Sequence, residues 1–319
     1  MHKPIFHDPT GRRGRWTGWS VAFLVLLVLA AATALGFTIF EMPVPPPLPL
    51  RMEQARLHAL AERIAAPHRH FRLIHHDWLP KHALTPRNGR QLVTGFYVPW
   101  DDTSRASFAA HVGEMDWVVP AAASLTGPDH RFVADPDPRF DSILSNAAHR
   151  PAVIPMVQNA LGSQWDGPGL AALLHDPVAS TRLIDACERL VTLRHGAGIA
   201  FDFEELPKSA LPDYLRFLDA ADRRFDLHGW IVTAAVPVGD PDWNLAAFAR
   251  VTDRLFLMLY DEHWATGDPG PIASQGWFVQ RLQEAIRQTG RDKAIATIAN
   301  YGYDWTPGHP AEALSVEEA

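Results

Sequence analysis

The sequence predicts an α/β fold, a TIM-type (β/α)8 barrel that lacks its last strand and follows one N-terminal transmembrane helix. Seven short runs from residue 91 onward are continuously apolar, as strands covered on both faces are. Helix-like stretches separate these runs, as crossovers between parallel strands require. Residues 20–40 carry no charge, and about 20 apolar residues of helix span a bilayer.

The chain of 319 residues is expected to contain four segments. They are a cytoplasmic basic stub (1–18), a transmembrane signal-anchor helix (19–41), a proline-rich linker and connecting segment (42–90), and the barrel (91–319). Arg12, Arg13 and Arg15 precede the apolar segment, so the positive-inside rule places the N-terminus in the cytoplasm. We therefore expect a single-pass protein of the inner membrane with a periplasmic or extracellular barrel. A cleaved signal peptide is the alternative, although its apolar core is usually only about 7–15 residues long.

The expected strands and helices alternate along the whole barrel segment. The strands are 92–98, 117–120, 152–157, 198–203, 230–236, 255–260 and 293–300. The helices between them are 104–115, 141–148, 169–194, 211–225, 245–251 and 275–288. Seven such repeats fit an eight-stranded barrel better than an open sheet of five or six strands. No eighth strand is visible after residue 305, and we expect a truncated barrel, with another closing element as the alternative.

Composition excludes several classes of function. The net charge of −7 is spread along the chain, so no clustered basic face for nucleic acid is expected. Cys187 is the single cysteine, which rules out an intramolecular disulfide. Four histidines lie between residues 68 and 76, but their spacing fits no zinc signature. We expect neither a metal site nor a cofactor.

The fourth expected strand ends on two carboxylates. Asp202 and Glu204 are two residues apart, so their side chains point to the same face of the strand. The carboxyl-terminal face of such barrels carries the active site. Two adjacent carboxylates raise each other's proton affinity, so one can stay protonated near neutral pH as a general acid. An exposed acidic strand end that caps the next helix is the alternative.

The segment from Gly198 to Glu204 resembles the signature of glycoside hydrolase family 18, the chitinases and their relatives. That signature reads Asp-Gly-x-Asp-x-Asp-x-Glu. The resemblance implies that Glu204 is the proton donor and that Asp202 orients the substrate's acetamido group. Ala197 and Ala200 stand where the family has two further aspartates, which implies weaker catalysis.

Two later segments extend the resemblance, which covers about residues 91–305. Met258-Leu259-Tyr260-Asp261 is similar to the family's Met-x-Tyr-Asp motif, whose tyrosine and aspartate contact the acetamido group and the sugar. Residues 301–305 are similar to a Tyr-Gly segment followed by a tryptophan. The implied site is therefore Glu204, Asp202 and Tyr260 as catalytic residues. The implied substrate-binding residues are Asp261, Met258, Tyr301 and Trp305. Trp100 joins them as a candidate because it follows the first expected strand, where an aromatic side chain can stack on a sugar.

Further tryptophans and aspartates lie near the ends of the expected strands. Trp165 and Trp264 lie in expected loops, where sugar stacking and packing are equally consistent. Trp117 and Trp230 start strands and are expected in the core. Asp101 and Asp102 follow the first strand, and we expect Asp102 to cap the next helix.

The resemblance implies a glycosidase that acts on polymers of β-linked N-acetylglucosamine, such as chitin, peptidoglycan or an exopolysaccharide. Its mechanism is substrate-assisted retention. The alternative is a non-catalytic glycan-binding module of a membrane polysaccharide synthesis system. The N-terminal layout is similar to bacterial proteins that join a family 18-like domain to a polysaccharide deacetylase and a family 2 glycosyltransferase, which makes both enzymes candidate partners.

Overall fold

The computed structural model describes residues 81–85, 91–126, 131–161, 164–306, 309 and 311–315. The chain divides into two compact units, Met1–Leu73 and Ile74–Ala319, and all described residues belong to the second. The predicted stub, the anchor helix and the four histidines lie outside the described residues. Within the described part, no helix is long and apolar enough to cross a membrane.

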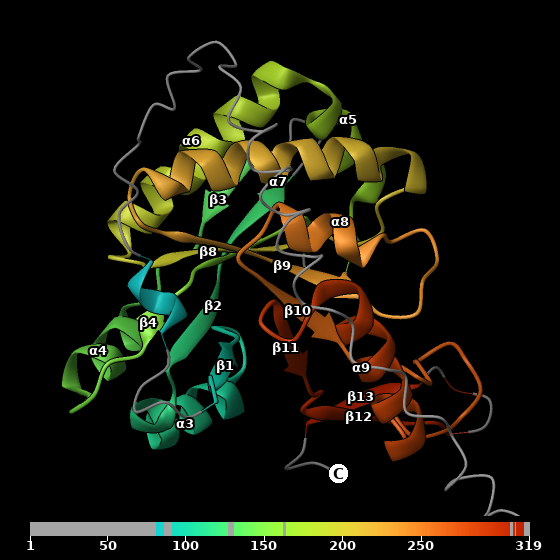
Figure 1. Cartoon of the computed structure of the whole chain (residues 1–319). Coiled ribbons are helices and arrows are strands. Elements are labelled where there is room, and N and C mark those ends of the chain that lie inside the picture. Colours follow the sequence, from blue (N-terminus) through green and yellow to red (C-terminus); the bar gives the residue numbers. More distant parts are fainter. Residues whose placement is uncertain are drawn as a thin grey trace, which may run out of the picture. The chain divides into compact units, whose positions relative to one another are not determined.

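The described unit is built on a curled parallel sheet (Figure 1). Its strands follow the path β1-β2-β5-β8-β9-β10-β11, and each neighbouring pair along that path is parallel. Their bounds are β1 Thr94–Tyr97, β2 Trp117–Thr126, β5 Met156–Gln158, β8 Gly198–Asp202, β9 Ile231–Pro237, β10 Arg254–Met258 and β11 Ala294–Thr297. All seven predicted strands are confirmed. Among the described residues the path does not close, because β1 and β11 do not pair.

Shorter strands accompany this sheet, and the apolar pattern indicated none of them except β4, which lies within the run predicted over 152–157. β3 (Arg131–Ala134) pairs antiparallel with β2, and β4 (Ala152–Val153) pairs parallel with it. Two antiparallel hairpins stand apart, β6 (Ala160–Leu161) with β7 (Gln164–Trp165) and β12 (Tyr301–Asp304) with β13 (Glu312–Ser315). These pairs are too short for a periodic signal to appear in the sequence.

Helices connect the strands as predicted, with one correction. Their bounds are α3 Asp102–His111, α4 Pro138–Asn146, α5 Gly167–His175, α6 Pro177–Leu193, α7 Leu211–Asp226, α8 Leu245–Arg250 and α9 Gln275–Thr289. The single helix expected over 169–194 is two helices. Asp176 ends α5 in an extended conformation and caps α6 by accepting from the Val178 N–H, because a residue before proline disfavours the helical region.

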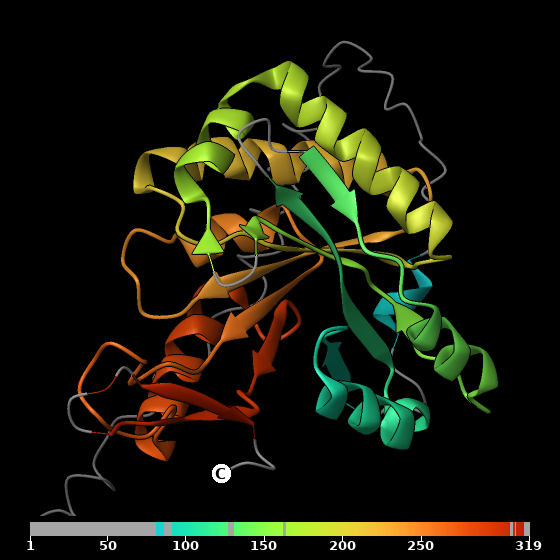
Figure 2. The same cartoon turned by 180° about the vertical axis from the view of Figure 1, so that it is seen from behind.

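Alternating side chains of the sheet build two cores. Ile199, Phe201 and Phe203 pack toward the helices, where Phe217 of α7 meets the Phe201 ring edge-on at 5.0 Å. Ala200 points the other way, into a smaller apolar cluster inside the curl with Met156 and Phe256. Figures 1 and 2 show α5, α6 and α7 along one side of the sheet. Burial of each large side chain contributes about 1.5–3 kcal/mol.

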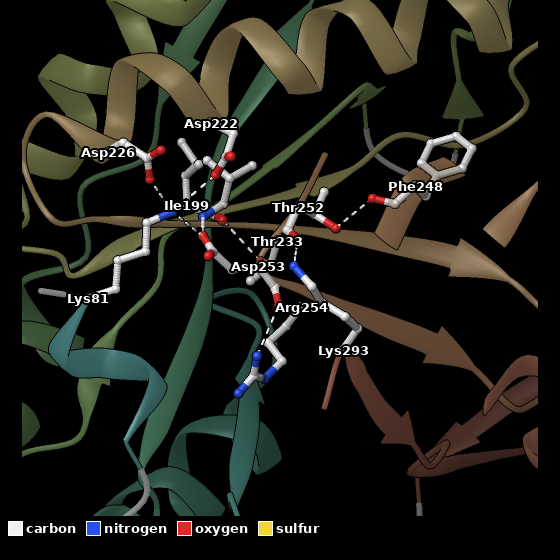
Figure 3. A network of polar contacts seen from close by, with 11 residues as sticks. Lys81, Ile199, Asp222, Asp226, Thr233, Phe248, Thr252, Asp253, Arg254 and Lys293 are labelled. Atoms are coloured by element: carbon white, nitrogen blue, oxygen red, sulfur yellow. Dashed lines mark hydrogen bonds and ion pairs between the residues drawn. The ribbon is translucent and has the colours of Figure 1, made fainter. Parts of the chain in front are cut away.

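The amino ends of the strands are held by a lysine network (Figure 3). Lys81 donates to Asp222 at 3.1 Å and Asp253 at 2.7 Å, and it forms an ion pair with Asp226. Asp222 and Asp226 lie on the last turns of α7, and Asp253 directly precedes β10. Burial alone would lower the pKa of Lys81, but the hydrogen bonds to Asp226 and Asp253, and then the negative charges of Asp253 and Asp222, raise it above its ordinary value.

The short η1 helix (His82–Leu84) follows Lys81 at the same end of the sheet. The indole N–H of Trp117 donates to the Ala83 carbonyl at 2.8 Å, and Leu84 packs against the inner cluster. Lys81 and η1 therefore cover the amino end of the sheet, so the opposite, carboxyl end carries the candidate site.

Candidate active site

Asp202 ends β8 and faces a glutamine on the neighbouring strand. The register of β5 and β8 sets Gln158 directly opposite Asp202, and the Gln158 amide donates to Asp202 Oδ2 at 2.8 Å. Burial raises the pKa of Asp202 above its ordinary value, and the hydrogen bond from Gln158 opposes that rise. Asp202 is thus a partly buried carboxylate with one fixed oxygen.

Glu204 follows two residues later, and its backbone is fixed by a buried asparagine. Asn159 accepts from the Glu204 N–H at 2.9 Å and donates to the Glu204 carbonyl at 3.0 Å. Burial, and then the negative charges of three nearby carboxylates, raise the pKa of Glu204 to about 7. Those carboxylates are Asp202, Asp261 and Glu205. A carboxyl group with such a pKa is about half protonated at neutral pH, which suits a general acid.

Tyr260 and Asp261 follow β10 and approach the same place. Burial, and then the charges of Asp202, Glu204 and Asp261, raise the pKa of Tyr260. The Tyr260 hydroxyl therefore stays protonated and can donate a hydrogen bond. Asp261 has a φ of 60°, a conformation uncommon for residues other than glycine, and such strain is concentrated at functional sites.

Tyr301, at the start of β12, holds Asp261. Its hydroxyl donates to Asp261 Oδ1 at 2.6 Å. Its ring meets Tyr260 edge-on, with 6.2 Å between centroids. Burial raises the pKa of Asp261, while the hydrogen bond from Tyr301 lowers it. The structure therefore brings Asp202, Glu204, Tyr260, Asp261 and Tyr301 to one end of the sheet.

A glycine next to the site sets how closely α5 approaches the loop after β8. A Cβ atom added to Gly167 would lie 1.8 Å from the Glu205 carbonyl oxygen. No side chain fits there unless the backbone beside Glu204 moves.

The other residues named from the sequence lie in varied surroundings. Met258 is half-buried against the inner apolar cluster. Trp305 ends a ladder of edge-on rings that runs from Tyr301 through Tyr303. Trp100 and Trp264 are exposed, with Trp100 at 71%. None of the described hydrogen bonds or ring contacts joins Trp100 to the carboxylates.

One expectation about neighbouring residues, the cap on α3, needs correction. Asp101, not Asp102, caps α3, because the Asp101 carboxylate accepts from the N–H groups of Thr103 and Ser104. Trp117 is fully buried as expected. Trp230 is half-buried and packs against the main core, with its ring edge-on to Phe225 at 5.7 Å and stacked on His228 at 4.3 Å between centroids.

Gln158 and Asn159 are functional candidates that the sequence pattern did not indicate. They come just after the apolar run of the third predicted strand, where polar residues look like the start of an ordinary loop. Their position at the carboxyl end of a predicted parallel strand, where active-site residues of such barrels lie, could have identified them. Among the described residues, no group of three or more histidine, cysteine or acidic side chains is arranged to hold a metal ion.

Comparison with known proteins gives a consistent family. The model for glycosyl hydrolases family 18 matches residues 93–316. The putative sporulation-specific glycosylase YdhD of Bacillus subtilis is 30% identical over 158 residues, which are 46% of this chain and 38% of that protein. The uncharacterized glycosylase YvbX of the same organism is 27% identical, over 44% of each chain. This chain therefore spans less than half the length of these relatives.

The fold has a solved counterpart in a chitinase from Chromobacterium violaceum. That structure superposes with a TM-score of 0.63 at 20% identity and covers 70% of this chain and 74% of its own. At that identity the likeness shows the fold, an α/β arrangement of the TIM-barrel kind. The family match includes β8 and β10 with their carboxylates and covers well over half of the chain, so the chain belongs to glycosyl hydrolases family 18.

Proposed function

We propose that this chain hydrolyses glycans that contain β-linked N-acetylglucosamine, by substrate-assisted retention with Glu204 as the general acid. The observation that carries the proposal is Glu204 itself. Its pKa is raised to about 7 by burial and by the charges of Asp202 and Asp261. No described hydrogen bond engages its carboxyl group, so the acid is available to a substrate.

The proposed reaction uses each residue at a stated atom. The acetamido oxygen of the bound sugar attacks the anomeric carbon, and the bond to the leaving oxygen breaks as Glu204 gives that oxygen its proton. Asp202 Oδ1, which accepts no hydrogen bond among the described residues, receives the acetamido N–H. The Tyr260 hydroxyl donates to the acetamido oxygen. Water then opens the cyclic intermediate while the Glu204 carboxylate removes a proton from that water.

The substrate class follows from this chemistry and from the relatives. Substrate assistance requires an N-acetyl group beside the scissile bond, which restricts the glycan to N-acetylhexosamine units. One solved relative is described as a chitinase and one curated relative as a sporulation-specific glycosylase. Chitin, peptidoglycan and an N-acetylglucosamine exopolysaccharide all contain the required unit.

A second candidate, a non-catalytic glycan-binding module, rests on Ala200. This residue is 1% exposed and stands where the family signature has an aspartate. A module without turnover would need the sugar-binding surface but not the proton transfer. Both candidates use the same surface, so a single pair of variants separates them.

The test compares the full chain with Glu204→Gln and Glu205→Gln on a chromogenic N-acetylglucosamine oligomer. The amide introduced by Glu204→Gln cannot act as the acid, so hydrolysis should fall by about 10²–10⁴-fold. Glu205 is the exposed neighbour whose charge contributes least to the raised pKa of Glu204, so its variant should keep most of the activity. Equal rates in wild type and Glu204→Gln, zero included, would exclude catalysis. Oligomer binding that survives in Glu204→Gln would then identify the module.

The location and the partners rest on sequence alone. We propose a single inner-membrane anchor over residues 19–41 with the barrel on the far side of the membrane. We also propose that the chain works beside a polysaccharide deacetylase or a glycosyltransferase. Membrane fractionation and protease protection of the barrel in spheroplasts test the first proposal, and co-purification tests the second.

A further inference from the structure

The family signature has an aspartate two residues before Asp202, on the same face of the strand, and this chain has Ala200 there. The preceding inward position is Ala200, which is buried in the apolar cluster with Met156 and Phe256. The Ala200 methyl group cannot accept, donate or share a proton. Asp202 is a partly buried carboxylate, and a buried charge without a hydrogen bond costs stability, so a partner must come from elsewhere.

That partner comes from the neighbouring strand. The β5–β8 register places Met156 opposite Ala200 and Gln158 opposite Asp202. The Gln158 amide lies 2.8 Å from Asp202 Oδ2. The amide nitrogen is the group that faces the carboxylate, because an ionised carboxylate only accepts hydrogen bonds.

We propose that Gln158 is the positioning residue for Asp202 and takes over the part of the acid missing at position 200. The amide fixes Oδ2 and leaves Oδ1 to receive the acetamido N–H. The inference rests on the proposed function for its catalytic consequence, although the contact itself does not.

The amide of Gln158, in place of a carboxyl group at position 200, changes how Asp202 titrates. Two adjacent carboxyl groups share a proton and titrate as a pair. A glutamine does not titrate, so Asp202 ionises without such coupling to an inner carboxyl group. Gln158 also favours the charged form of Asp202, because it donates to the carboxylate.

Two substitutions in the full chain test this role. Gln158→Met keeps the length of the side chain and removes the donor, which should raise the Asp202 titration midpoint by about one to two pH units. The kcat should fall by about tenfold to a hundredfold at neutral pH, with KM changing less. Gln158→Glu donates only while it is protonated, so its activity should recover relative to Gln158→Met as the pH falls.

A matched control lies on α9. Gln280 donates to Glu284 at 3.0 Å in an exposed amide–carboxylate pair. Gln280→Met should therefore leave both the pH profile and the Asp202 titration unchanged. The thermal transition of each variant establishes that it is folded.

The decisive readout is the titration of the Asp202 carboxyl carbon by NMR. An equal midpoint in wild type and Gln158→Met would overturn the role, as would pH profiles for both Gln158 variants that are scaled down without any shift. A wild type that hydrolyses nothing would refute the proposed function alone, because the titration still decides what Gln158 does. A raised midpoint in folded Gln158→Met supports the role in either case.

Discussion

Carboxylates cluster at both ends of the sheet, but only those at the amino end are paired with a cation among the described residues. At the amino end, Asp222, Asp226 and Asp253 share the ammonium group of Lys81. At the carboxyl end, no described ion pair neutralises Asp202, Glu204 or Asp261. The amino end therefore pairs its carboxylates with a cation, although burial still raises the pKa of Asp222. At the carboxyl end burial raises the pKa values of Asp202, Glu204 and Asp261, and for Glu204 the nearby negative charges add to that rise.

This difference teaches which end can do acid chemistry. A carboxylate paired with a lysine stays ionised and cannot give up a proton at neutral pH. An unpaired group among like charges holds its proton and can transfer it. Carboxylates thus contribute to stability at the amino end and to the proposed acid chemistry at the carboxyl end. Four predictions test this difference between the two ends.

The largest effect on stability should come from Lys81→Met. Three partly buried carboxylates would lose their cation, and the free energy of unfolding should fall by roughly 2–4 kcal/mol. Urea unfolding of the full chain, followed by tryptophan fluorescence, measures this change. The exposed Lys208 provides the control, and Lys208→Met should alter stability by about 0.5 kcal/mol or less. Similar unfolding midpoints for both variants would contradict the stabilising role of Lys81 at the amino end.

Glu204→Gln should increase the free energy of unfolding, and this gain should appear only above acidic pH. The folded pKa of about 7 exceeds the ordinary 4.5, so the folded state binds more protons than the unfolded state between those values. Stability is therefore lost as pH rises through that window. The variant should exceed wild type by about 3 kcal/mol at pH 8 and by nothing at pH 4. A difference in unfolding free energy that stays constant from pH 4 to pH 8 would show that the raised pKa of Glu204 is not its cause.

The pH–rate profile should report the same group. Because the proposed mechanism requires a protonated Glu204, kcat/KM for the chromogenic oligomer should fall about tenfold per pH unit above roughly pH 7. Steady-state kinetics from pH 5 to 9 measure the slope. A rate that stays level up to pH 9 would assign the acid to another residue.

The smallest effect should come from Tyr301→Phe. Loss of the 2.6 Å hydrogen bond to Asp261 should raise the pKa of Asp261 further and lower kcat/KM by about five- to thirtyfold. The ring remains, so its edge-on contact with Tyr260 should persist. Unchanged kinetics would mean that the conformation of Asp261 does not depend on this bond.

Most of the fold was predictable because the strands are covered on both faces. Seven apolar runs marked seven strands, and helical spacing marked the connections. The split between α5 and α6 at Asp176 does not show in the hydrophobic period, which continues through it. Pro177 was a readable signal, since proline fits the first turn of a helix and disrupts its interior.

The candidate site was predictable only in part. Topology alone brings four site residues to the same end of one parallel sheet, because β8 leads to Asp202 and Glu204 while β10, two strands along, leads to Tyr260 and Asp261. Gln158 and Asn159 act through strand register and backbone contacts, which no motif records. The cap on α3 shows the same limit. Asp101 and Asp102 are adjacent and chemically identical, so only the backbone geometry shows that Asp101 is the one that caps the helix.

Gly167 shows that a position can control reactivity without contributing any functional group. Its missing Cβ leaves room for the Glu205 carbonyl, and any larger residue would displace the loop that carries Glu204. In a mutational scan scored by turnover, this site should tolerate as little variation as Glu204 itself. An engineer who wishes to alter the sugar-binding surface would do well to leave it untouched.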